Sequence, residues 1–177
     1  MSEEKKENKF LQNILQNLKA KNHGLVLKAL QDAKQRGTIH VLPGVIEALL
    51  QSDDDLVYEE AKSILFELKV GKAGEVLVDY LQKDSSAGHR DVLVSALWQS
   101  SAACEEYLTF LVELACNENY MTTLEVLTVI ENLEGELNDD EVTECISALN
   151  DCIENGGDEE KMKLLSSMVE VLENLRS

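Results

Sequence analysis

Apolar residues recur at helical spacing along almost all of this 177-residue chain, and short polar segments interrupt the pattern roughly every 12 to 18 residues. The 9 glycines and 1 proline are too few for the many turns of a β-sandwich or barrel. Leu, Glu, Lys, Ala and Gln, which favour helices, dominate the composition, while aromatic residues make up only 5%. The sequence therefore predicts an all-α protein of about ten helices.

Local start signals place these helices along the chain. Pro43 suits the first turn of a helix, and the polar run 52–55 can cap the next one. Asn138 and Glu141 have the spacing of a capping box, and Asp158 is a further cap. The expected helices lie near residues 6–21, 23–36, 39–51, 52–69, 72–83, 87–100, 103–117, 119–134, 138–155 and 158–176. Their short connections predict that consecutive helices pack antiparallel.

A weak internal repeat runs through the middle of the chain. Similar apolar patterns align at Ala61, Val94 and Val126, which are 33 and 32 residues apart. One shorter amphipathic stretch lies between each pair, so the repeating unit is a helical hairpin. Repetition of this kind indicates a stack of hairpins and argues against a single globular bundle.

Residues 45–68 resemble a repeat of the HEAT and armadillo type, with a helix ending in a Leu-Leu pair, an acidic turn and a helix with Val, Ala and Leu at the family's spacing. The resemblance is best over 42–100, although Tyr58 stands where Arg is usual, and the Trp, Gly, Tyr and Pro pattern of the rival tetratricopeptide repeat is missing. Residues 95–131 are similar to uncharacterised bacterial HEAT-repeat proteins. The resemblance implies one right-handed α-α superhelix (solenoid) over 1–177, with about five hairpins and capping helices at 1–22 and 156–177.

Charge is distributed very unevenly along the chain. Residues 1–90 contain 13 basic and 14 acidic residues, a net charge of −1, whereas residues 91–177 contain 3 and 20, a net charge of −17. A field of this sign repels phosphates and anionic lipids and attracts basic segments. We therefore expect no nucleic-acid or membrane partner.

Two expected helices of the acidic half place carboxylates opposite their apolar stripes. Such helices line the concave side of HEAT-type folds, so the resemblance implies an acidic concave surface that binds a basic protein or peptide. The expected binding residues are Glu106, Glu113, Asp140, Glu144 and Asp151, continued more thinly by Glu47, Glu75 and Asp79. The alternative is that these side chains are only a solvated face.

No group of residues in the sequence indicates a reaction. His23, His40 and His89 fall in different expected repeats, and no glycine-rich phosphate loop is present. The acidic run 53–55 lacks the ligand spacing and glycine of a calcium loop. The cysteines, at positions 104, 116, 145 and 152, form no CxxC pair and are expected to be reduced thiols. We expect no catalytic residue, metal or cofactor, and a non-enzymatic protein-binding scaffold or adaptor.

Some HEAT-like proteins are nevertheless enzymes. A DNA glycosylase needs a basic face for the DNA backbone, which this charge excludes. A lyase or cofactor-attachment factor remains the alternative. The N-terminus has neither a secretory signal nor an apolar span, so we expect a cytoplasmic protein. The apolar face of the first helix, including Phe10 and Ile14, must be covered either by the next helix, giving a monomer, or by a second copy.

Overall fold

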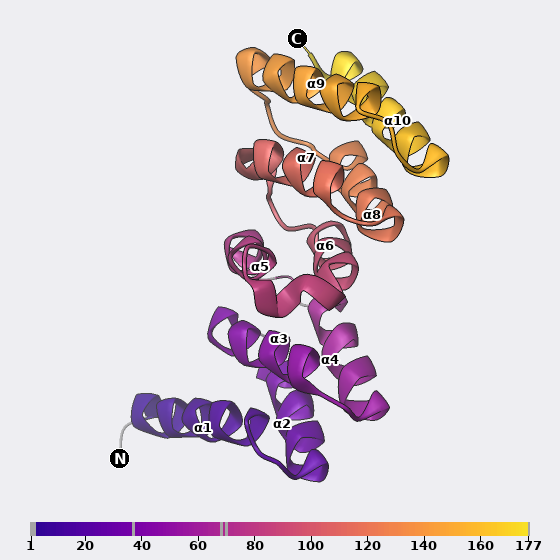
Figure 1. The fold of residues 1–177 in the computed structure, drawn as a ribbon. Coiled ribbons are helices and arrows are strands. Elements are labelled where there is room, and N and C mark those ends of the chain that lie inside the picture. The colour runs from indigo at the N-terminus through magenta and orange to yellow at the C-terminus, as the bar shows by residue number, and fades with distance from the viewer. Residues whose placement is uncertain (1–2, 37, 68, 70, 177) are drawn as a thin grey trace. The chain divides into compact units, whose positions relative to one another are not determined.

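A computed structural model describes residues 3–36, 38–67, 69 and 71–176, with side chains from residue 7 onward except that of Arg36. This part of the chain is all-helical, as predicted, with ten α-helices and three short 3-10 helices (Figure 1). The α-helices are α1 (Glu3–Leu18), α2 (His23–Arg36), α3 (Leu42–Gln51), α4 (Asp55–Glu67), α5 (Ala73–Leu81), α6 (Arg90–Gln99), α7 (Leu108–Asn117), α8 (Tyr120–Glu131), α9 (Asp139–Glu154) and α10 (Glu159–Leu175). The 3-10 helices are η1 (Ile39–Val41), η2 (Asp84–His89) and η3 (Glu105–Tyr107).

The expected ends of the helices agree with the structure to within about one turn, except that the seventh was expected from residue 103 whereas α7 begins at Leu108, after the 3-10 helix η3. The fourth helix was expected to reach Lys69, but α4 ends at Glu67, and residues 68 and 70 lie outside the described part. Backbone contacts divide the chain into two compact units. Unit 1 comprises residues 1–88 and 99–102, and unit 2 comprises residues 89–98 and 103–177.

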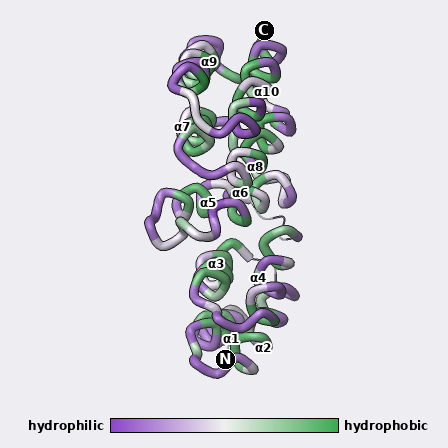
Figure 2. Tube along the Cα trace, turned by 45° about the vertical axis from the view of Figure 1, so that its right-hand side comes forward, coloured by the Kyte–Doolittle hydropathy of each residue, from purple (hydrophilic) through white to green (hydrophobic). Residues whose placement is uncertain are grey.

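Unit 1 is a stack of antiparallel hairpins. Helices α1 and α2 form one pair and α3 and α4 the next, while α2 packs on α4 and α3 contacts both α1 and α5. The interior side chains are aliphatic, and most of α3 is coloured as hydrophobic in Figure 2. Gly44 lets α1 approach α3 closely, because a Cβ at this position would lie 2.8 Å from Cδ1 of Leu18. The apolar face of α1 is thus covered within unit 1, and both Ile14 and Leu18 are buried.

Unit 2 repeats this arrangement. Helices α7 and α8 form one pair, α9 and α10 form the next, α7 packs on α9, and α8 packs on α10. The odd-numbered helices of the unit therefore form one layer and the even-numbered helices the other. Leu108, Leu111, Leu149, Leu165 and Leu172 are completely buried between them. Each such side chain stabilises the fold by about 1.5–3 kcal/mol.

The caps of three helices are those that the sequence predicted. The Asn138 side chain accepts hydrogen bonds from the backbone N–H groups of Asp140 (2.9 Å) and Glu141 (3.1 Å) at the start of α9. Asp158 caps α10, and Asp54, within the predicted run 52–55, caps α4. One detail was wrong, because Glu141 does not complete a capping box but bonds Thr109 of α7.

Hairpins stacked in two layers are compatible with the expected solenoid. Four of the expected five hairpins lie within one unit or the other, whereas α5 belongs to unit 1 and most of α6 to unit 2. The right-handed superhelix, the single domain over 1–177 and the two capping helices stay predictions. No helix in the described part of the chain is both long and apolar enough to cross a membrane.

Candidate acidic binding surface

The five carboxylates expected to bind a partner all belong to unit 2, and we call them the acidic surface. Glu106 lies in η3, Glu113 in α7, and Asp140, Glu144 and Asp151 in α9. All five side chains are exposed, as helical periodicity predicted. They therefore come from neighbouring helices of the odd-numbered layer.

Helices α7 and α9 meet along a seam at Thr109 and Cys145. The Thr109 hydroxyl donates to Oε1 of Glu141 (2.9 Å) and lies 3.9 Å from the Cys145 sulfur. Burial is the main cause that raises the pKa of Cys145, and the carboxylates of Glu141, Glu144 and Glu113 raise it further, against the Thr109 hydrogen bond. Three negative charges from two helices thus gather around one thiol.

The structure brings together only part of the predicted set. Glu113 and Glu144 both act on Cys145, whereas no contact in the described residues links Glu106, Asp140 or Asp151 to them. Asp140 also lies in the first turn of α9, where a carboxylate stabilises the helix dipole irrespective of any partner. The best-supported centre of the acidic surface is therefore the pair Glu113 and Glu144.

Glu141 is one of the three carboxylates around Cys145, but the sequence predicted another role for it. Its position in the first turn of α9 favoured a capping function. Its actual partner, Thr109, is 32 residues away in sequence. The helical register of α7 against α9 was the only signal that could have joined these residues.

Three of the cations of unit 2 have partners away from the acidic surface. Arg90 forms an ion pair with Glu118 at the end of α7, and Lys163 pairs with Glu159 and Glu160 on its own helix. Lys161 of α10 donates to the backbone carbonyls of residues 116 (2.7 Å) and 118 (2.6 Å). Within the described part of the chain, no lysine or arginine pairs with the acidic surface. Its charge is therefore open to an external cation.

A hydrogen bond between Glu105 and Gly135 fixes the segment that precedes α9. The Glu105 carboxylate accepts hydrogen bonds from the backbone N–H groups of Cys104 and Gly135, both at 3.0 Å. Backbone N–H groups, first its own and then those of residues 134, 135 and 104, lower the pKa of Glu105 despite partial burial. A Cβ at position 135 would lie 2.8–2.9 Å from the Glu105 side chain, so the contact requires glycine.

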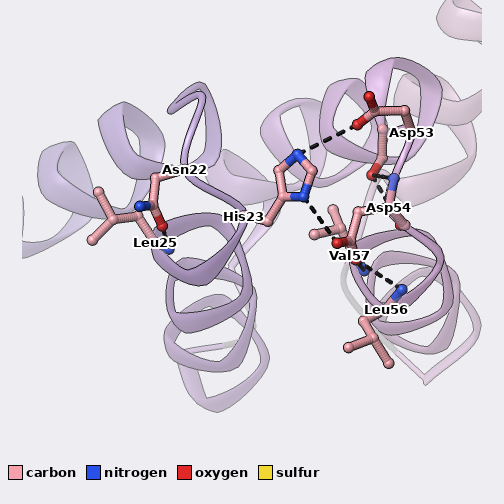
Figure 3. A network of polar contacts seen from close by, with 8 residues as sticks. Asn22, His23, Leu25, Asp53, Asp54, Leu56 and Val57 are labelled. Carbon is pink, nitrogen blue, oxygen red and sulfur yellow. Dashed lines mark hydrogen bonds and ion pairs between the residues drawn. The ribbon is translucent and has the colours of Figure 1, made fainter.

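Unit 1 contains an open cleft of about 430 Å³. It is lined by Leu18, Lys19, Ala20, Lys21, His23, Val26, Ala48, Gln51, Ser52, Asp53 and Val57. At its edge His23 lies between two carboxylates, with Nδ1 2.9 Å from Asp54 and Nε2 3.3 Å from Asp53 (Figure 3). The N–H of Val57 and then the His23 side chain lower the pKa of Asp54.

The contacts of His23 with Asp53 and Asp54 have a structural role. Asp54 holds the first turn of α4 by accepting from the N–H groups of Leu56 and Val57, and His23 at the start of α2 joins the two hairpins. The contact spans 31 residues and had no sequence signal. Glu47, which was expected to extend the acidic surface, instead pairs with Lys19 (3.3 Å) and accepts from the Tyr80 hydroxyl (3.0 Å).

No protein-family model matches the chain, and no curated protein is significantly similar to it. The HEAT and armadillo resemblance therefore stays a prediction.

Proposed function

We propose that this chain is a non-enzymatic, HEAT-like protein-binding scaffold and that its acidic surface captures a basic peptide or a basic segment of a partner protein. The observation that supports this most strongly is the exposed carboxylate pair Glu113 and Glu144, from two packed helices, with no cation of the described chain paired to it. The alternative of a lyase or cofactor-attachment factor stays a prediction.

The physical argument rests on long-range attraction. Unit 2 contains 4 basic and 20 acidic residues, so its field draws cations from a distance. A surface of fixed helices also holds its carboxylates in place before binding, which limits the entropy lost on association. Lysine or arginine side chains spaced to reach both α7 and α9 are the chemistry that fits.

The test is to measure the partner's affinity with a charge-neutral variant. A partner is first isolated by pull-down from lysate at low salt, and its Kd is then measured for wild type and for Glu113→Gln with Glu144→Gln. We expect a loss of roughly tenfold or more, since each exposed charge contributes up to about 1 kcal/mol. Binding of wild type should also weaken strongly as salt rises.

The matched control is Glu170→Gln with Glu173→Gln on α10. Both residues are exposed, and the pair removes the same net charge from the same unit but from the other layer. We expect it to change Kd by less than about threefold. Equal losses in the two double variants would show that partners respond to net charge alone, and the acidic surface would then be only a solvated face.

A further inference from the structure

The seam between α7 and α9 brings two cysteines together. Thr109 and Cys145 face each other at one level, with 3.9 Å between oxygen and sulfur. Cys116 lies seven residues after Thr109, and Cys152 lies seven residues after Cys145. Two helices that run side by side in the same direction rise equally over seven residues, by about 10.5 Å. The second pair therefore faces each other across the same seam, and Cys152 is close enough to raise the pKa of Cys116.

These two thiols differ from the other two cysteines in access. Cys116 and Cys152 are half-buried, whereas Cys104 and Cys145 are only 4% and 2% exposed. All four are free thiols. A small reagent can therefore reach the facing pair, while the fold protects the two single cysteines.

Burial and the neighbouring groups of Cys116 set how readily its thiol ionises. Burial raises its pKa most, and Cys152 of α9 and the carboxylate of Glu113 on α7 raise it further. The ammonium group of Lys161 on α10, which is bonded to the backbone carbonyl of Cys116, acts in the opposite direction. The thiol is thus largely protonated at neutral pH, and its reactions should quicken as pH rises.

We propose that Cys116 and Cys152 form a redox pair, which a small disulfide oxidant such as oxidised glutathione converts into an intramolecular disulfide that ties α7 to α9. One cysteine thiolate attacks the oxidant, forming a mixed disulfide and releasing one glutathione thiolate. The thiolate of the other cysteine then attacks the protein sulfur of that mixed disulfide and displaces the second glutathione. Two electrons pass to the oxidant, and the two protons lost by the cysteines end on two glutathione molecules.

The bond would join the two helices that carry the acidic surface. It would close a loop containing α8, and a loop of that length constrains the unfolded chain. Oxidation should therefore raise the Tm of unit 2 by roughly 5 °C or more. The proposal does not depend on a binding partner.

The test uses the full chain with oxidised glutathione at about pH 8.5, above neutral for thiolate formation. After quenching with acid, the remaining thiols are alkylated under denaturing conditions and the peptides are mapped by mass spectrometry. We expect the loss of two of the four free thiols, one peptide pair linking Cys116 to Cys152, and a raised Tm that dithiothreitol reverses.

The Cys152→Ser variant should stop at the mixed disulfide and retain one glutathione. The matched control, Cys104→Ala, keeps the facing pair and should close the bond as wild type does. The proposal is overturned if wild type also stops at mixed disulfides, if the bond joins another pair of cysteines, or if oxidation leaves Tm unchanged. Mapping of wild type decides the matter even if a variant folds poorly.

Discussion

The two compact units have the same stacked hairpins but differ in the balance and pairing of their charged residues. In unit 1, which has 12 basic and 14 acidic residues, Lys19, His23 and Lys34 each pair with a carboxylate from another part of the stack. In unit 2, which has 4 basic and 20 acidic residues, backbone N–H groups donate to Glu105, and no lysine or arginine among the described residues pairs with the acidic surface. A helical stack of this kind therefore does not require acidity, and the excess in unit 2 calls for another explanation.

The largest expected effect tests whether the two units are separate bodies. Leu149 in unit 2 and Leu49 in unit 1 are both 0% exposed. Truncation of either to Ala should cost about 2–5 kcal/mol through lost burial and a cavity. In hydrogen exchange, Leu149→Ala should speed exchange in α7–α10, and Leu49→Ala should do so in α1–α4. Uniform acceleration across the described chain by either variant would contradict the division.

The next effect concerns the few cations of unit 2. Lys161→Met should lower the free energy of unfolding by about 1–3 kcal/mol, because two carbonyls at the end of α7 lose a charged donor. Lys163→Met, which breaks only exposed pairs on its own helix, should change the free energy of unfolding much less. Urea unfolding of the two variants measures this contrast, and equal costs would mean that the Lys161 contact adds nothing.

A third prediction uses pH. The pKa of Glu105 is lowered in the folded state, so the ionised carboxylate stabilises the fold above its unfolded pKa of about 4.3. That stability disappears as pH falls through the folded pKa. Glu105→Gln should cost about 1 kcal/mol at pH 7. The unfolding free energies of wild type and variant should converge as pH falls below the folded pKa of Glu105. For Asp54→Asn in unit 1, the difference in unfolding free energy from wild type should also shrink as pH falls, because the pKa of Asp54 is lowered as well.

The smallest effect is that of salt. Raising NaCl from 50 to 500 mM screens repulsion among the carboxylates of unit 2 and should stabilise it by less than about 1 kcal/mol. In unit 1 the same salt screens favourable pairs such as Lys34 with Glu67 and should leave stability unchanged or slightly lower. Hydrogen-exchange rates, measured separately for the two units at both salt concentrations, report the two changes in stability. The same response in the two units would remove the electrostatic difference between them.

The sequence predicted those features that depend on nearby residues. Asn138, Asp158 and the run 52–55 cap helices because a cap needs only a side chain and the next turn of backbone. Exposure of the acidic surface followed from helical periodicity in the same way.

Contacts between helices could not be predicted without their register. The bond from Thr109 to Glu141, the pair His23 and Asp54, and the meeting of Cys116 with Cys152 each join residues 31 to 36 positions apart. A search for local metal-binding spacing passes over such a cysteine pair.

The bond from Lys161 to the end of α7 also sets an order of events during synthesis. The carbonyls of Cys116 and Glu118 leave the ribosome well before their donor, which lies 45 and 43 residues later. Until α10 emerges, the end of α7 has to be solvated by water, so the layer formed by α7 and α9 cannot reach its final stability. A nascent chain halted between residues 155 and 161 should therefore be more open to proteolysis there than one extended past α10.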